Sequence, residues 1–231
     1  MRATNASGDS TNVAASATTG SLPAAPTGLT PTVVSSSQIN LAWTDNSGNE
    51  TGFIIERATD SGFTADLTTV TTTAANVTSY NNTTGLSADT LYYYRVRATN
   101  GYGDSGNATA SATTLPAAPA NPSNLAATAV SATAVALTWD DNSSNETEFK
   151  LERKTGSGGT YAQIATPAAD ATSYSDATAA EGVQYYYRLR ATNTGGDAAV
   201  TSEASAITPL TAPATFTGTA ASDTQADLAW S

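Results

Sequence analysis

A thirteen-residue segment is written twice in this chain, almost a hundred residues apart. The sequence "ETGFIIERATDSG" at residues 50–62 is matched by "ETEFKLERKTGSG" at residues 146–158. Trp43 and Trp139 are 96 residues apart, and other landmarks recur at nearly the same interval. A period of about ninety-five residues is too long for a solenoid repeat, so it predicts a complete small domain that occurs more than once.

The two ends of the chain copy the interior of the repeat. Residues 1–19 match residues 96–114 almost letter for letter, and residues 216–231 copy residues 29–44. The end segments lack the partners needed to close a core, so we expect them to be disordered unless neighbouring chains cover them. The expected divisions are 1–21, the end of one repeat with its last strand; 22–114 and 115–208, two complete domains; and 209–231, the first two strands of a further repeat.

Proline-rich segments stand at the expected joints, at residues 22–26, 115–122 and 209–213. Proline fixes its own φ and pushes the preceding residue toward extended conformations. We therefore expect short and fairly stiff joints.

Within each repeat the apolar residues alternate with polar ones, which is typical of half-buried strands. Clusters of Gly, Asn, Asp and Ser separate these runs, and no segment favours a long helix. Six or seven short strands over about ninety residues predict an antiparallel β-sandwich. The positions expected to face the core are Ile39, Leu41, Trp43, Phe53, Ile55, Tyr92, Tyr94, Val96 and Ala98 in the first repeat, and Val135, Leu137, Trp139, Phe149, Leu151, Tyr185, Tyr187, Leu189 and Ala191 in the second.

Several of these features occur together in one family. They are the proline-rich entry, the tryptophan of the second strand, the aromatic-x-aliphatic pattern of the third strand, and the sequence Y-x-Y-R-[VL]-R-A-T-N followed by a Gly-rich loop. With them, each repeat resembles a fibronectin type III domain, of the kind found in tandem on secreted bacterial proteins. The resemblance implies an all-β chain of tandem immunoglobulin-like antiparallel sandwiches. It also places Tyr92 and Tyr185 at the tyrosine corner, where the hydroxyl bonds the backbone of the preceding turn.

The composition offers little chemistry. The chain has no His and no Cys, so the commonest general base and the strongest nucleophile are missing. We therefore expect no enzyme activity, no cofactor, and no catalytic, cofactor-binding or metal residues. The net charge of −11 repels phosphate backbones and anionic headgroups, which argues against nucleic acid as a partner. No apolar run is long enough for membrane insertion.

The loops between the second and third expected strands, named the B–C loops, gather carboxylates and amides at residues 45–50 and 140–146. Calcium prefers such ligands, but their order does not match the loop of an EF-hand. We favour the interpretation that Asp and Asn cap turns through their own backbones. In that interpretation Glu50 and Glu146 pair with a strand arginine.

Other surface features have plain interpretations as well. In the F–G loops, at residues 100–105 and 193–198, there is no Arg-Gly-Asp, and Tyr102 is either a contact residue or part of a simple turn. Tyr93 and Tyr186 are expected to face outward and pack on arginines through cation–π contacts. Asn49 and Asn145 are the best candidates for glycosylation. Asn-x-Ser/Thr triplets occur at Asn5, Asn49, Asn76, Asn81, Asn82, Asn107, Asn142 and Asn145.

These features favour a non-catalytic structural array that serves as a spacer, stalk or fibre component of an extracellular or cell-surface protein. Its expected partners are copies of itself or neighbouring repeats, and extracellular polysaccharide or matrix. One alternative is an accessory spacer of a secreted polysaccharide-degrading enzyme. Another is an adhesive binding module, although the near identity of the two B–C loops favours a structural role.

Overall fold

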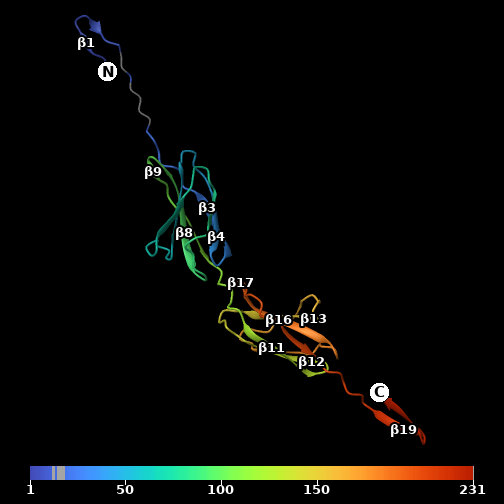
Figure 1. Cartoon of the computed structure of the whole chain (residues 1–231). Coiled ribbons are helices and arrows are strands. Elements are labelled where there is room, and N and C mark those ends of the chain that lie inside the picture. The colour runs from blue at the N-terminus through green and yellow to red at the C-terminus, as the bar shows by residue number, and fades with distance from the viewer. Residues whose placement is uncertain (12–13, 15–18, 231) are drawn as a thin grey trace. The chain divides into compact units, whose positions relative to one another are not determined.

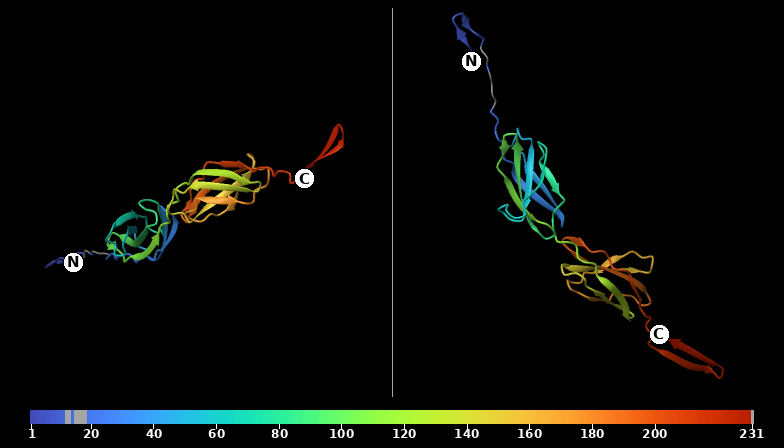
Figure 2. Two further views of the ribbon diagram at one scale, coloured as in Figure 1. Left: turned by 90° about the horizontal axis from the view of Figure 1, so that it is seen from below. Right: turned by 60° about the vertical axis from the view of Figure 1, so that its left-hand side comes forward.

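The computed structural model describes residues 1–11, 14 and 19–230, and all regular secondary structure in that part of the chain is β-strand (Figure 1). The chain divides into two compact units, Met1–Thr114 and Leu115–Ser231. Each unit contains one sandwich and one short hairpin. The views in Figure 2 show each sandwich as two facing layers of strands.

The first sandwich packs a three-stranded antiparallel sheet against a five-stranded one. The smaller sheet has the order β3-β4-β7, and the larger has the order β10-β8-β5-β6, with β9 added to the end of β8. The strands are β3 (Thr27–Ser35), β4 (Gln38–Thr44), β5 (Gly52–Ala58), β6 (Thr68–Thr72), β7 (Ser79–Asn82), β8 (Leu91–Asn100), β9 (Gly103–Asp104) and β10 (Ala108–Thr113).

The second sandwich repeats this topology. Its smaller sheet has the order β11-β12-β15, and its larger sheet has the order β14-β13-β16-β17, with β18 also paired to β16. The strands are β11 (Ser123–Ser131), β12 (Ala134–Asp140), β13 (Glu148–Thr155), β14 (Ala162–Ala165), β15 (Ser173–Asp176), β16 (Gln184–Asn193), β17 (Gly196–Asp197) and β18 (Ala204–Ile207).

Each sandwich is closed around its own core, and the predicted inward positions are confirmed. All eighteen residues expected to face the core are buried, with exposed fractions of 5% or less. In the first core Trp43 lies against Phe53 with ring centroids 5.5 Å apart, and in the second Trp139 lies against Phe149 at 5.6 Å. Since each pair joins the smaller sheet to the larger, the aromatic contact ties the two layers together.

The tyrosine corner is confirmed in both domains. The Tyr92 hydroxyl accepts a hydrogen bond from the backbone N–H of Ser87 at 2.8 Å, and the Tyr185 hydroxyl accepts one from Ala180 at 2.9 Å. The turn before β8 and the turn before β16 are therefore fastened to the strand that follows them.

The end segments are not disordered throughout, so that expectation is wrong for the residues that the structure describes. β1 (Thr4–Asn5) pairs with β2 (Gly8–Asp9) in the register that β8 and β9 use. Likewise β19 (Phe216–Ser222) and β20 (Gln225–Trp230) form a hairpin with the register shift seen between β3 and β4. These pairings join residues close in sequence, so they form without a closed core. Most of the expected last strand of the 1–21 fragment falls outside the described residues.

The outward-facing charges of the larger sheet pair with one another across strands. In the first domain the Glu56 carboxylate accepts hydrogen bonds from Arg95, at 2.5 Å, and from Arg97. In the second domain Glu152 bonds Arg188 at 2.6 Å. This pairing lowers the pKa of Glu56, chiefly through the hydrogen bond from Arg97.

The cation–π contacts differ from those expected. Arginine lies over the core-facing tyrosines, with Arg57 4.9 Å from the ring centre of Tyr92 and Arg153 4.5 Å from that of Tyr185. The outward ring of Tyr186 meets a lysine, Lys154, instead of an arginine. The arginines of the same strands lie over other rings, with Arg95 4.7 Å from the ring centre of Phe63 and Arg188 4.1 Å from that of Tyr161.

One buried polar position distinguishes the two cores. In the second domain Asp176 is 1% exposed and accepts hydrogen bonds from Tyr187 at 2.9 Å and from Arg153 at 2.6 Å. In the first domain Asn82 takes this place, with its amide oxygen facing Tyr94 and Arg57. The second core therefore encloses a titratable carboxylate where the first encloses a neutral amide.

We expect Trp43→Ala to lower the free energy of unfolding of the first domain by ~3–5 kcal/mol, because it opens a cavity between the sheets. Calorimetry of the whole chain should show one transition shifted down and the transition of the second domain unchanged. Trp43→Phe should cost less, since the indole N–H of Trp43 is buried without a hydrogen-bond partner. Equal shifts of both transitions would contradict the presence of two separate cores.

The second domain should lose stability on acidification through Asp176. Burial raises the pKa of Asp176, but hydrogen bonds from Thr178, Arg153 and Tyr187 outweigh burial and hold the pKa below its usual value. The ionised group therefore stabilises the fold above the unfolded pKa of about 3.9, and this contribution is lost as the pH falls through the lower folded pKa.

Calorimetry at a series of pH values tests the role of Asp176. The variant Asp176→Asn places at this position the residue type that the first domain has, Asn82. The variant should melt below the parent at neutral pH, and the two melting temperatures should converge below about pH 3. A constant difference across the acid range would rule out titration of Asp176.

Candidate functional site

The most elaborate polar structure outside the cores is found where the chain enters each sandwich. In the first domain the side-chain amides of Asn49 and Asn100 both donate to the backbone carbonyl of Ser21, at 3.1 and 3.0 Å. Asn49 comes from the B–C loop and Asn100 from the end of β8. Asn100 also donates to the backbone carbonyl of Asn49 at 3.1 Å, and this bond links the end of β8 to the B–C loop.

The second domain repeats the arrangement at the same interval. Asn145 and Asn193 donate to the carbonyl of Ala117 at 3.0 and 2.8 Å, and Asn193 also donates to the carbonyl of Asn145 at 3.0 Å. Ser21 and Ala117 are 96 residues apart, as are Asn49 and Asn145. The entry contacts are therefore a property of the repeat.

A third asparagine fastens the next part of the entering segment. Asn46 donates to the carbonyl of Ala25 at 2.9 Å, and Asn142 donates to that of Asn121 at 2.8 Å. Two prolines of each entering segment are buried beside these bonds. We call the three asparagines of each domain its entry clamp: Asn46, Asn49 and Asn100 in the first domain, and Asn142, Asn145 and Asn193 in the second.

The exit from each sandwich is also fixed. Thr114 is 2% exposed, and its hydroxyl donates to the carbonyl of Ser87 at 2.6 Å. Thr208 holds the same place after β18, where its hydroxyl donates to Ala180 at 2.5 Å. Between the anchored Thr114 and the anchored Ala117 the chain has two residues, Leu115 and Pro116.

The B–C loops confirm one part of the sequence interpretation and correct another. Asp45 and Asp141 cap their own turns, each accepting a backbone hydrogen bond from the serine two residues on, at 2.9 and 3.0 Å. The asparagines, in contrast, bond the entering segment through their side-chain amides.

Glu50 and Glu146 do not pair with a strand arginine. They accept hydrogen bonds from the backbone N–H groups of Asn76 and Asp170, each at 3.2 Å. The expectation fails because the neighbouring arginines bond Glu56 and Glu152 within the sheet. The backbone N–H of Glu50 and the hydroxyl of Ser47 hold the pKa of Glu50 below its usual value.

The F–G loop of the first domain places Tyr102 at its tip. The side chain is 66% exposed, and its ring lies against Gly20, where an added Cβ would come within 2.0 Å of two ring atoms. In the second domain Gly195 stands at this position and lies against Pro116. Part of the Tyr102 ring therefore covers the entering segment, and its outer face is open to solvent.

The asparagines of the Asn-x-Ser/Thr triplets differ in how accessible their side-chain amides are. Asn82 is fully buried, so its amide is inaccessible in the folded domain. The amides of Asn49, Asn142 and Asn145 are exposed but take part in the entry clamps, and a glycan on any of these nitrogens would disturb the clamp bond.

The first domain has a pocket beside Arg57. Its volume is about 270 Å³, and its lining is mostly threonine, serine and glycine with a single carboxylate, Asp66. A glycosidase mechanism needs two carboxyl groups that flank the bond to be cleaved. The pocket does not provide that pair.

The entry clamp is the feature that sequence reasoning missed. Its signal was visible, since Asn49 and Asn100 recur as Asn145 and Asn193 in the two repeats. The partner carbonyls belong to unremarkable residues, however, and only the folded chain brings them next to the amides.

Comparisons with known proteins agree with the fold. Residues 24–114 match the family model of the fibronectin type III domain. A crystal structure of the FN1–FN3 domains of chicken CNTN1 superimposes with a TM-score of 0.51 at 17% identity, covering 90% of this chain and 76% of that one. A two-domain fibronectin type III segment of chicken tenascin gives a TM-score of 0.39 at 16% identity, covering 80% and 99%. The sequence matches no curated protein.

The class of protein is thus a series of antiparallel β-sandwiches of immunoglobulin-like topology. More narrowly, residues 24–114 match the fibronectin type III domain, as the sequence resemblance implied, and the second sandwich repeats the topology of the first. In the part of the chain that the structure describes, no helix has the length and apolar character needed to cross a membrane.

Proposed function

We propose that this chain is a non-catalytic, extracellular structural array that acts as a spacer, stalk or fibre component of a cell-surface protein. Fibronectin type III domains are commonly structural or adhesive modules and are typical of extracellular and cell-surface proteins. The finer assignment rests on the joints between the domains.

The observation that carries the proposal is the short joint between two anchored positions. The Thr114 hydroxyl fastens the end of the first sandwich, and Asn145 and Asn193 fasten the start of the second at Ala117. Leu115 and Pro116 alone lie between these anchors, and Pro116 has a fixed φ. A joint with so few free dihedral angles resists bending, which is the property a spacer needs.

The distribution of charge supports the same proposal. Eight of the nine basic residues form ion pairs with carboxylates, and the ninth, Arg57, bonds the carbonyl of Thr84. All nine lie among the described residues, so no unpaired cation is available for phosphate. This distribution disfavours nucleic acid and anionic membranes as partners.

Partners of the array follow from its surface. Strands β6 and β14 end the larger sheets, so a neighbouring repeat or a further copy of the chain can pair with them as an added strand. Extracellular polysaccharide or matrix is a second class of partner, for which the exposed face of Tyr102 is a contact point. Either class suits a stalk that displays or assembles other domains.

Distance measurements between two spin labels by electron paramagnetic resonance test the stiffness of the joint at Leu115 and Pro116. The chain has no cysteine, so Ala42→Cys and Thr138→Cys place one spin label on an exposed, equivalent strand position in each domain. We expect a narrow distribution of label distances for the parent. The distribution should broaden when Asn145→Ala and Asn193→Ala remove the two hydrogen bonds to the carbonyl of Ala117, or when a Gly-Ser pair is inserted between Leu115 and Pro116.

Asn49→Ala with Asn100→Ala is the matched control, because it removes the equivalent hydrogen bonds to Ser21 in the first domain and leaves this joint intact. The control should keep the narrow distribution. A parent distribution as broad as that of the insertion variant would refute a stiff spacer.

A further inference from the structure

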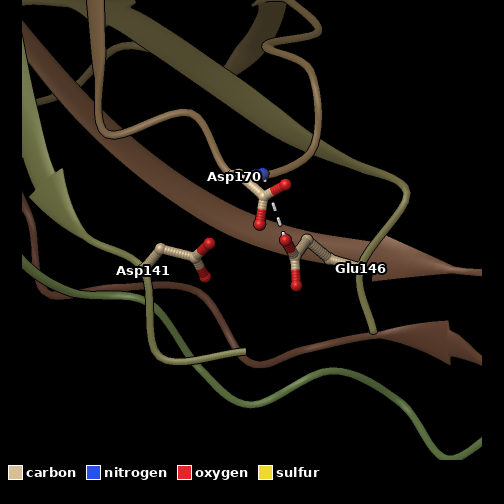
Figure 3. A group of neighbouring side chains, drawn as sticks. All are labelled: Asp141, Glu146 and Asp170. Carbon is tan, nitrogen blue, oxygen red and sulfur yellow. Dashed lines mark hydrogen bonds between the residues drawn. The ribbon is translucent and has the colours of Figure 1, made fainter. Parts of the chain in front are cut away.

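Three carboxylates of the second domain come together from two separate loops. Asp141 and Glu146 belong to the B–C loop, and Asp170 belongs to the turn between β14 and β15. One oxygen of each lies within 4.8 Å of the others, and Figure 3 shows the three side chains directed toward a common space. Sequence reasoning considered the B–C loop alone and did not include Asp170.

Glu146 shows that this group is more than a chance cluster of surface acids. Its side chain is buried, with 7% of the residue exposed, and its Oε2 atom has no hydrogen-bond partner. Its Oε1 atom accepts the backbone hydrogen bond from Asp170. A buried carboxylate oxygen without a partner is costly, so a missing ligand is the direct explanation.

The surroundings of Glu146 favour a cation as that ligand. One carboxylate oxygen of Asp141 and one of Asp170 lie within 4.8 Å of an oxygen of Glu146, so the negative charges of the group attract a positive ion. No lysine or arginine forms an ion pair with Asp141, Glu146 or Asp170, all of which lie among the described residues.

We propose that Asp141, Glu146 and Asp170 bind a calcium ion. Calcium–oxygen distances of 2.3–2.6 Å place ligands on opposite sides of one ion about 4.8 Å apart, so oxygens that all lie within 4.8 Å of one another fit around it. The ligand set contains only carboxylates, which suits a hard cation. Because water must complete the coordination shell, we expect a Kd on the order of 10⁻⁴–10⁻³ M, the range of extracellular calcium modules.

The first domain contains a natural variant of the same site. Asp45, Glu50 and Asn76 occupy the equivalent positions, and Glu50 also has an unpartnered Oε2. Asn76 and Asp170 share a left-handed backbone, with φ of 61° and 60°, and both donate a backbone hydrogen bond of 3.2 Å to the glutamate. The two sites thus differ by one carboxylate, and the first should bind calcium more weakly.

Calcium at this site would act on the loop that holds the entry clamp. Asn142 and Asn145 stand between Asp141 and Glu146 in the sequence, and their amides bond the entering segment. An ion that ties Asp141 and Glu146 to Asp170 would therefore stiffen the same loop.

Calorimetric titration of the full chain with calcium chloride, at ionic strength matched with sodium chloride, tests the proposal. The parent should bind one ion in the stated range, and calcium should raise the melting temperature of the second domain in a way that a chelator reverses. Asp170→Asn should weaken this binding about tenfold or more, because it removes one ligand charge. Both residues tolerate the left-handed backbone, so the variant should remain folded.

Two matched variants sharpen the test. Asn76→Asp should create a second site of similar affinity in the first domain. Asp140→Asn removes an equal charge from the same loop but retains an acceptor for Asn124, and it should leave calcium binding within about twofold of the parent.

Absence of calcium binding at millimolar concentration would overturn the proposal. So would binding that Asp170→Asn leaves unchanged, or that Asp140→Asn weakens as much as Asp170→Asn does, since either would indicate a diffuse attraction to an acidic loop.

Discussion

The contact between a tryptophan of one sheet and a phenylalanine of the other is the interaction on which the rest of each domain depends. Trp43 lies one residue before the end of β4 and Phe53 one residue after the start of β5, so the B–C loop spans the gap between the two sheets where their rings meet. The same holds for Trp139 and Phe149. Because the rings fix both ends of the loop, they also position its asparagines and carboxylates. The entry clamp and the acidic cluster are thus consequences of core packing.

Local sequence accounts for much of the fold. The alternation of apolar residues identified every inward position that was named, because half-buried strands impose a period of two. The hairpins β1–β2 and β19–β20 form outside the two sandwiches, with the registers of β8–β9 and β3–β4. Each hairpin pairs two strands that follow one another in the sequence, so the turn sets the register without help from the core. Expecting disorder in these segments underestimated that local contribution.

The candidate sites depend on contacts that the sequence does not reveal. Asn193 reaches the carbonyl of Ala117 across 76 residues, and backbone carbonyls carry no sequence signal. Asp170 joins the B–C loop from a turn that composition does not mark as special. The expected pairing of Glu50 with an arginine failed for a similar reason, since strand register places Glu56 opposite Arg95. In each case several residues could have served chemically as the hydrogen-bond or ion-pair partner, and the tertiary fold determines which one lies close enough.

Each of the two sandwiches closes around its own aromatic core, and a short anchored connection joins them. The most direct test of these separate cores is the thermal unfolding of residues 115–208 expressed alone, compared with the second transition of the full chain. We expect a cooperative transition at the same temperature, because the core of the second domain draws on residues of that domain only. An isolated segment that fails to fold, or melts far below the same domain in the full chain, would contradict it.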